Sequence, residues 1–234
     1  MEDEKTIEVV RRRRLWRQTP VTWTLIFVNV LWFVGVEGFR GLSLQGIVQS
    51  GALDWPDVVS GGQWWRLFTA MFVHLSLTHI GLNMVSLASL YVVEWLMGSW
   101  MFLTTYLVSG LVGNLAILLI GAHNVPSAGA SGAIFGIFGV ALYMSFKGIL
   151  TKAARNQLLI VLVINLAYGF SSPDIGNSAH IGGLIAGVFL AAWLLAKPQL
   201  RYAKGVRYLS IGLSIVTVVA LILALPGHSP ALGI

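Results

Sequence analysis

Long, uninterrupted apolar stretches dominate the pattern of this chain. Seven of them are long enough to span or nearly span a lipid bilayer, and they lie near residues 20–38, 78–97, 100–121, 130–147, 155–171, 178–196 and 206–225. Apolar residues run continuously through each stretch instead of alternating with polar ones, which argues against a β-barrel. The connections near 98–99 and 148–154 are short, whereas the one at about 39–77 is long. The pattern predicts an all-α, polytopic membrane bundle that forms one domain.

The composition agrees with a membrane protein. Of the 234 residues, 56% are hydrophobic and only 10% are charged, and the mean hydropathy is +0.80. Ordinary soluble domains are far more polar than this. The chain has no cysteine, which excludes disulfides, thiol nucleophiles and zinc–thiolate sites. We expect neither a cofactor nor a metal.

The basic residues lie almost entirely on one side of the predicted membrane. The 13 of 15 that share a side are Lys5, Arg11, Arg12, Arg13, Arg14, Arg17, Lys147, Lys152, Arg155, Lys197, Arg201, Lys204 and Arg207. The positive-inside rule therefore predicts a cytoplasmic tail over residues 1–19 and, after seven spans, an external C-terminus. The net charge of +6 then reports topology, and nucleic acid is not an expected partner. Acidic residues near the start disfavour a mitochondrial presequence.

Four polar residues stand out because polar groups in membrane helices are costly. Ser131 precedes Lys147 by 16 residues and His180 precedes Lys197 by 17, so both lie roughly 24–26 Å above the cytoplasmic face at about 1.5 Å per residue. His79 and Asn83 are four residues apart, on one face of a helix that also enters from outside. Three helices therefore bring polar side chains to a common depth, below the outer surface.

Small residues at four-residue spacing would let two of these helices approach closely. Gly132 and Gly136 form one such pair, and Gly183 and Gly187 form another. A hydrogen bond between Ser131 and His180 requires that approach. Simpler interpretations exist: a membrane serine often bonds its own backbone, a buried histidine often links helices, and paired glycines often serve packing alone.

These residues resemble the rhomboid family of intramembrane serine proteases. "GQWWRLFTAMFVHLSLTHIGLNM" at 62–84 is similar to the family's Trp-Arg loop and His-x-x-x-Asn helix. "GASGAIFG" at 129–136 is similar to its Gly-x-Ser-Gly motif, and "NSAHIGGLIAG" at 177–187 to its histidine helix. The resemblance covers about residues 20–196, as a six-helix rhomboid-like core, with residues 197–234 adding a cytoplasmic loop, a seventh helix and a short external tail.

The resemblance implies hydrolysis of peptide bonds in or beside a substrate's transmembrane segment. Ser131 would be the nucleophile and His180 its general base. His79, Asn83 and the backbone N–H of Ser131 would form the oxyanion hole. Gly129 and Gly132 would keep that N–H approachable. Transmembrane protein substrates and membrane lipids are the implied partners.

Three residues near the motifs are considered separately because they depart from the family pattern or allow a second interpretation. Phe135 stands where the family often has tyrosine beneath the base, which keeps aromatic stacking without the hydroxyl. Glu94 falls one residue short of the spacing of the family's acidic residue. Asp174 precedes His180 by six residues, and we favour a loop role for it over a catalytic triad.

Histidines and aromatic residues outside the motifs are expected to be structural. Trp65 and Arg66 are expected to anchor the outer loop at the membrane interface. We interpret His74 as structural, and His123 and His228 as loop residues. Shifting of the fifth helix, at 155–171, is the expected route for substrate entry, as the family comparison suggests.

Two other functions stay open at this stage. A non-catalytic chaperone or adaptor on the same scaffold would bind membrane helices without cleaving them. A small-solute transporter is disfavoured, because the polar residues gather near one face and no inverted repeat is evident. The predicted location is a multi-pass position in a prokaryotic cytoplasmic membrane.

Overall fold

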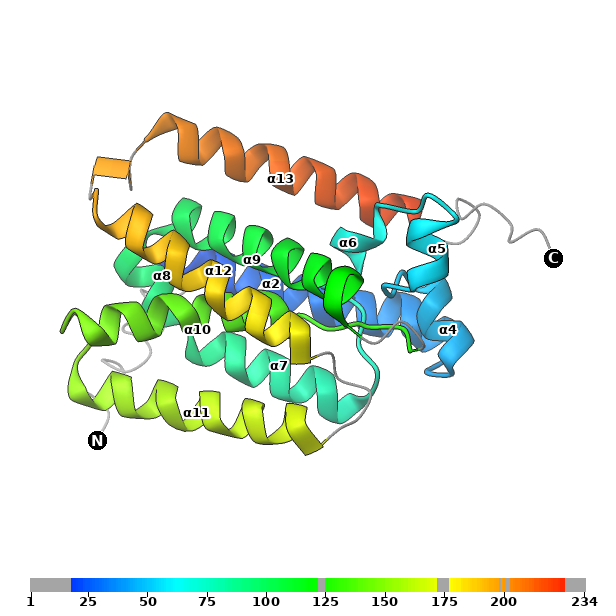
Figure 1. Ribbon diagram of the computed structural model, residues 1–234, viewed down its shortest axis with the longest axis horizontal. Helices are drawn as coiled ribbons and strands as arrows, with labels where there is room; N and C mark the ends of the chain where they lie inside the picture. Colours follow the sequence, from blue (N-terminus) through cyan, green and yellow to red (C-terminus); the bar gives the residue numbers. More distant parts are fainter. Residues whose placement is uncertain (1–17, 122–124, 172–176, 198, 201–202, 226–234) are drawn as a thin grey trace, which may run out of the picture.

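Helices make up almost all of the regular structure in this computed structural model, which describes residues 18–121, 125–171, 177–197, 199–200 and 203–225 (Figure 1). Within those ranges there is no strand, and one isolated antiparallel bridge joins Leu53 to Ser127. The all-α bundle predicted from the apolar stretches is therefore confirmed.

The helices coincide with the predicted stretches, and every predicted limit lies within three residues of the observed one. The first span combines α2 (Pro20–Trp32), a π-helical turn η1 (Phe33–Glu37) and α3 (Gly38–Arg40), and the second combines α7 (Leu77–Ser89) and α8 (Tyr91–Met97). The others are α9 (Ser99–Ile120), α10 (Ser131–Phe146), α11 (Lys152–Ser171), α12 (Asn177–Leu195) and α13 (Lys204–Leu223). Among the described residues, six of these seven units are long and apolar enough to cross a membrane. The seventh, α10, has 16 residues, or about 24 Å.

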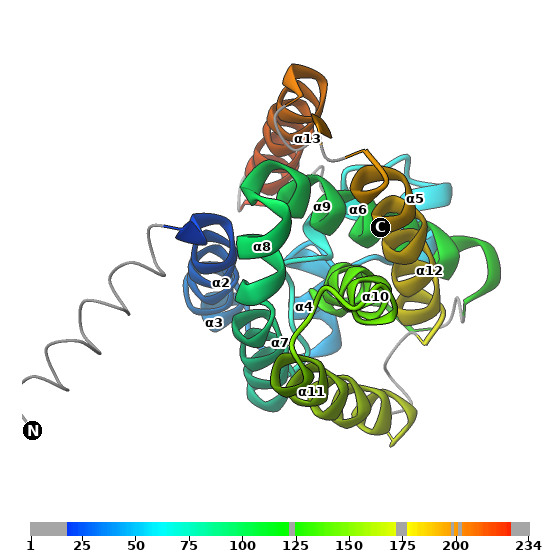
Figure 2. The same ribbon diagram turned by 90° about the vertical axis from the view of Figure 1, so that its left-hand side faces the viewer.

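The short helix α10 lies at the centre of the bundle, with α7, α9, α11 and α12 around it (Figure 2). Each of its residues from Gly132 to Ala141 is buried. The segment is apolar on all sides, and such a helix is stable only where neighbours cover its whole circumference. Residues at the start of α10 are therefore enclosed by other helices.

Glycines set the distance between α10 and α12. A Cβ built on Gly183 would lie 2.0 Å from the carbonyl oxygen of Gly132, and one on Gly187 would lie 1.9 Å from that of Gly136. No side chain fits in these gaps, so the two backbones touch directly. The small residues predicted to permit close approach thus lie at the contact.

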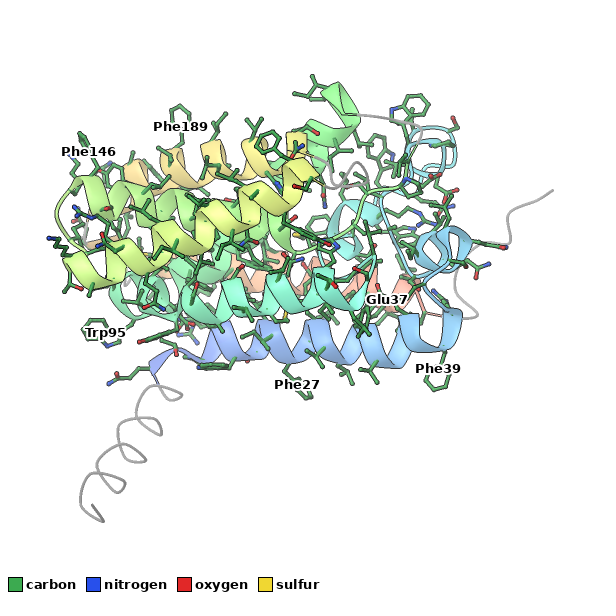
Figure 3. All side chains as sticks on the ribbon, turned by 90° about the horizontal axis from the view of Figure 1, so that it is seen from below. Phe27, Glu37, Phe39, Trp95, Phe146 and Phe189 are labelled. Carbon is green, nitrogen blue, oxygen red and sulfur yellow. The ribbon has the colours of Figure 1, made fainter. Side chains whose placement is uncertain are left out.

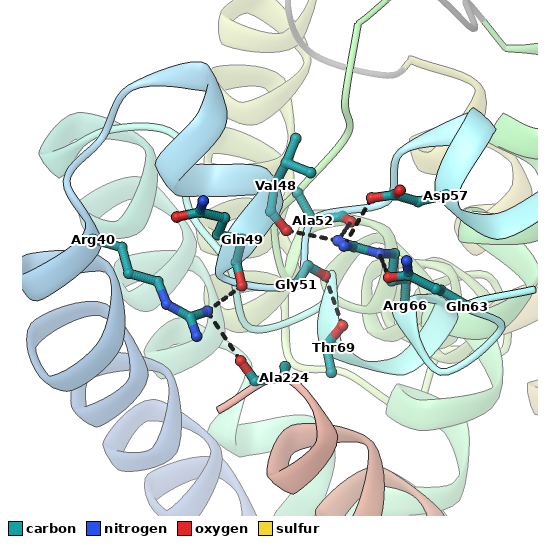
Figure 4. Close-up of polar contacts among 10 residues, drawn as sticks. All are labelled: Arg40, Val48, Gln49, Gly51, Ala52, Asp57, Gln63, Arg66, Thr69 and Ala224. Carbon is teal, nitrogen blue, oxygen red and sulfur yellow. Dashed lines mark hydrogen bonds and ion pairs between the residues drawn. The ribbon is translucent and has the colours of Figure 1, made fainter. Parts of the chain in front are cut away.

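The long first connection is folded, which the sequence did not predict. It contains α4 (Leu44–Gln49), α5 (Trp55–Val59) and α6 (Arg66–Thr69) at the end of the bundle where α7, α10 and α12 begin (Figure 1). The buried Arg66 holds this loop from inside (Figure 4). Its guanidinium donates to the carbonyls of Val48 and Ala52 at 2.6 and 2.8 Å and pairs with Asp57 at 2.8 Å.

The peripheral helices α13 and α11 lie on opposite sides of the bundle (Figures 1 and 2). Large apolar side chains, among them Phe27, Phe39, Phe146 and Phe189, point outward from several helices (Figure 3). So much exposed apolar surface suits lipid and not water. With its apolar helices, the chain is an integral, multi-pass membrane protein.

Candidate active site

Ser131 is the first residue of α10. Just before it, Gly129 has φ +129°, a backbone conformation that other residues rarely adopt, and its N–H donates to the carbonyl of Ala70 at 2.9 Å. The N–H groups of a helix's first turn have no acceptor within the helix, so the N–H of Ser131 is available to a ligand. The partial positive charge of a helix start favours an anion there.

His180 lies in the first turn of α12 and reaches Ser131 directly. Its Nε2 is 2.8 Å from Ser131 Oγ, and the residue is 4% exposed. The imidazole stacks on Phe135, with ring centroids 4.2 Å apart and an interplanar angle of 6°. The structure therefore brings together the serine and histidine that the sequence placed at a common depth.

The other ring nitrogen of His180, Nδ1, has no hydrogen-bond partner among the described residues. A Cβ on Gly169 of α11 would lie 3.1 Å from it, so the backbone of α11 covers this side of the ring. Asp174 lies outside the described residues, as do His123 and His228. Within the described part, the pair is a serine and a histidine without a third member.

His79 and Asn83 lie on α7, one turn apart. Ser76 caps this helix by accepting the N–H of His79 at 3.1 Å. The N–H of Leu75 donates to His79 Nδ1 at 3.4 Å, so a neutral ring carries its proton on Nε2. A Cβ on Gly129 would lie 2.8 Å from that Nε2 and 3.6 Å from Ser131 Oγ, so both groups lie beside this glycine.

Asn83 offers a second donor. The residue is 1% exposed, and its Nδ2 has no partner among the described residues. A buried amide with an unused N–H is costly unless something accepts from it. Asn83 lies one turn after His79 on the same face of α7, so the two side chains project in the same direction.

A family comparison assigns the chain to a known family. The family described as Rhomboid domain matches residues 61–197, more than half of the chain and the whole of the site. The chain belongs to the rhomboid family. The resemblance seen in its motifs is thereby confirmed.

Relatives of this rhomboid have varied lengths and names. It is 36% identical to "Rhomboid protease GluP" of Bacillus subtilis, over 90% of this chain and 41% of that protein. It is 32% identical to "Putative rhomboid protease YdcA" of the same organism, over 78% of this chain and 92% of the relative. "Inactive RHOMBOID-like protein 8" of Arabidopsis thaliana is 33% identical, over 69% of this chain and 47% of that protein. The chain thus spans less than half of GluP and most of YdcA.

Trp65 and Arg66 of this rhomboid lie outside the site. Arg66 is 4% exposed and bonds the loop backbone, and its guanidinium lies 4.8 Å from the ring centroid of the partly buried Trp65. Burial lowers the pKa of Arg66, and Asp57 opposes that shift. Arg66 therefore holds the loop by donating to the loop's carbonyls, and the expected membrane-interface role of Trp65 and Arg66 stays a prediction.

Glu94, whose role the sequence left open, is buried at the far end of the second span. It accepts the N–H groups of Val21 and Thr22 at 3.0 and 2.7 Å and the hydroxyl of Ser99 at 2.7 Å. It therefore caps α2 from another helix, because the first N–H groups of a helix have no internal acceptor.

Sequence reasoning passed over Glu37, which lies inside the predicted first span and is fully buried. An ionisable residue in a membrane helix is itself a signal of function, and that signal was present in the sequence. The partner of Glu37, the backbone N–H of His74, could not be found by motif or spacing.

Proposed function

We propose that this rhomboid is a serine endopeptidase that hydrolyses peptide bonds in or next to transmembrane segments. The observation that carries the proposal is the 2.8 Å contact between His180 Nε2 and Ser131 Oγ, on two helices packed together through glycines. That distance lies within the hydrogen-bonding range that a general base needs. The catalytic core is residues 20–196.

The reaction begins when Ser131 Oγ attacks the substrate carbonyl carbon and His180 Nε2 takes the hydroxyl proton. The tetrahedral intermediate expels the amine, which receives that proton from His180. An acyl-enzyme on Ser131 remains. Water then attacks this ester, with His180 again acting as the base.

The oxyanion of the intermediate is stabilised by three donors: the backbone N–H of Ser131, Nε2 of His79 and Nδ2 of Asn83. Each is held by the fold before substrate arrives, and donors fixed in a site of low dielectric stabilise developing charge strongly. The start of α10 adds its own positive end. Phe135 restricts the imidazole to the plane in which Nε2 faces Ser131.

Charge supports an external position for the site. Lys147 follows the end of α10 opposite Ser131. Lys152 and Lys204 are the first residues of α11 and α13. Basic residues favour the cytoplasmic side, so the N-terminus is cytoplasmic, the C-terminus is external and the site lies below the outer surface. Substrates are transmembrane proteins in a prokaryotic cytoplasmic membrane.

Reconstitution with model transmembrane substrates tests the proposal. We expect cleavage to disappear in both Ser131→Ala and His180→Ala, and to fall about 100-fold in Asn83→Ala, the usual effect of losing one oxyanion donor. Mass spectrometry should place the scissile bond within or beside the membrane segment. The wild type should react with a fluorophosphonate at Ser131.

Persistent cleavage by the folded Ser131→Ala protein would exclude the serine mechanism. Equal binding of membrane helices by wild type and Ser131→Ala, with neither cleavage nor fluorophosphonate labelling, would favour the adaptor function instead.

A further inference from the structure

The first span turns a glutamate inward beside the proposed oxyanion hole. Glu37 ends the π-helical turn η1 and is 0% exposed, and its neighbour Val36 is 7% exposed. Glu37 lies inside the bundle, whereas Phe27 and Phe39 of the same span point outward (Figure 3).

The carboxyl group of Glu37 holds the chain just before α7. Its Oε1 accepts the backbone N–H of His74 at 2.6 Å across 37 residues of sequence. The His74 ring is fully buried and lies 3.2 Å, through Nδ1, from the carbonyl of Phe72. Burial lowers the pKa of His74 well below its ordinary value, so the ring is neutral and Nδ1 is the donor.

The segment at His74 and Leu75 contacts the His79 ring in two ways. The rings meet edge to face, with centroids 5.3 Å apart and an interplanar angle of 67°. The next residue, Leu75, donates its N–H to His79 Nδ1 at 3.4 Å. That bond is long for an N–H···N contact, so a displacement of a few tenths of an ångström breaks it. The proton on His79 Nε2 then depends on where the backbone at 74–75 is held.

We propose that Glu37 is a positioning residue for the oxyanion hole: it fixes the backbone of His74 and thereby the ring orientation and tautomer of His79. This inference rests on the proposed function. Glu37 reaches neither Ser131 nor His180 in any contact of the structure and is not itself catalytic.

Glu37 contributes little to the stability of the fold. Glu94, which is also buried, uses both carboxyl oxygens to accept N–H and hydroxyl groups. Glu37 uses one, and its Oε2 has no partner among the described residues. Burying a carboxyl group with a single partner costs free energy that an apolar side chain would not. Its placement is therefore better explained by the segment it holds.

The experiment compares Glu37→Met, which removes the acceptor, with Glu37→Gln, which keeps one, in the reconstituted full chain. We expect Glu37→Met to lower kcat about 10- to 100-fold with KM little changed, and Glu37→Gln to restore most of it. In a His79→Ala background, Glu37→Met should lower kcat less than about 3-fold further, because residues that act through one another are not additive. Glu94→Gln is the matched control, with lower thermal stability and unchanged kcat.

Glu37→Asp keeps the acid but withdraws it by one methylene, and it serves if Glu37→Met does not fold. It should also lower kcat. Wild-type kcat in whichever of these variants folds, or losses that multiply in the His79→Ala background, would overturn the positioning role.

Nitrogen NMR of the His79 ring separates this inference from the proposed function. We expect the Nε2–H tautomer in the wild type and a mixture in Glu37→Met, or in Glu37→Asp. If the wild type does not cleave, the proposed function fails, and the tautomer still decides the role of Glu37. An unchanged tautomer refutes the positioning role whatever the activity.

Discussion

The two sides of α10 are packed by opposite means. Towards α12, glycines let backbone meet backbone, as where Gly139 faces the carbonyl of Leu184, and towards α9 the bare backbone of Gly136 meets the side chain of Ser109. Towards α7 and α11, contact depends on side chains, and α11 buries only Leu158, Leu162, Asn165 and Gly169. Backbone contact cannot be relaxed by a change of rotamer, whereas contact through side chains can.

The proposed catalytic groups are divided between these two sides. Ser131 and His180 both belong to the close-packed pair α10–α12, so their 2.8 Å contact is set by backbone geometry. The helix that covers them belongs to the looser side. The Tyr168 ring of α11 lies 6.3 Å from that of His79, and Gly169 faces His180. Movement of α11 would uncover the site without disturbing the serine–histidine pair.

The largest effect is expected from filling the backbone contact. A Cβ on Gly187 would lie 1.9 Å from the Gly136 carbonyl, so Gly187→Val must force the helices apart. We expect little folded protein, as measured by thermal unfolding in detergent, and no cleavage. Gly212 of α13, where a Cβ meets nothing within 4 Å, is the matched control. A stable, active Gly187→Val protein would contradict the rigid side of the comparison.

The next largest effect on cleavage is expected from cross-linking α11 to α7 on the looser side. Asn165 of α11 donates to Ser86 of α7 at 2.7 Å, and the chain has no cysteine of its own. A short cross-link formed through disulfides to both thiols of a Ser86→Cys/Asn165→Cys protein should lower cleavage of a transmembrane substrate at least about 10-fold, because a large substrate requires separation of these helices. Reduction should restore the rate.

The same cross-linked protein provides its own control. Labelling of Ser131 by a small fluorophosphonate should persist, since the cross-link does not touch the serine–histidine pair and a small reagent needs less separation of α7 and α11 than a transmembrane substrate does. Undiminished cleavage after complete cross-linking would show that substrate enters elsewhere.

Much of this arrangement could be predicted because it follows from local properties of the chain. Apolar runs determined the helix limits, and the glycine spacings indicated which helices meet. The depth of Ser131 and His180, counted from Lys147 and Lys197, placed them at one level. Such features depend on a few neighbouring residues and on bilayer thickness.

Contacts between distant residues could not be predicted in this way. Glu94 caps α2 across 72 residues, and Glu37 bonds His74 through a backbone group that has no sequence signature. The helices α4 to α6 are each six residues or shorter, and helices this short owe their stability to tertiary contacts and not to propensity. A single buried side chain, Arg66, supplies several of those contacts.

A smaller effect is expected from removing one hydrogen bond on the looser side. Asn165→Leu breaks the link to Ser86, whose hydroxyl still donates to the Leu82 carbonyl at 2.6 Å. We expect a loss of about 0.6 kcal/mol in unfolding free energy, an average value for such bonds between membrane helices. Cleavage should become faster by about the same factor, up to roughly 3-fold, because 1.4 kcal/mol corresponds to tenfold. A slower enzyme would show that this bond helps catalysis rather than restraining α11.

The smallest effect on cleavage is expected on the opposite side of the bundle, at α13. Ser210 lies 2.5 Å from the hydroxyl of Thr104 and donates to the carbonyl of Trp100 at 2.8 Å, both on α9. Ser210→Ala, like Asn165→Leu, removes a side chain that forms hydrogen bonds to a neighbouring helix. Its cost in unfolding free energy should therefore be similar, about 0.6 to 1.7 kcal/mol. The cleavage rate per folded molecule should not change, because α13 covers neither His79 nor His180. Equal losses of stability with unequal effects on rate would show that the position of a contact relative to α10, and not its strength, decides whether it controls access to Ser131. A rate that rises as much in Ser210→Ala as in Asn165→Leu would instead mean that general loosening of the bundle speeds cleavage, and the distinction between its two sides would lose its functional meaning.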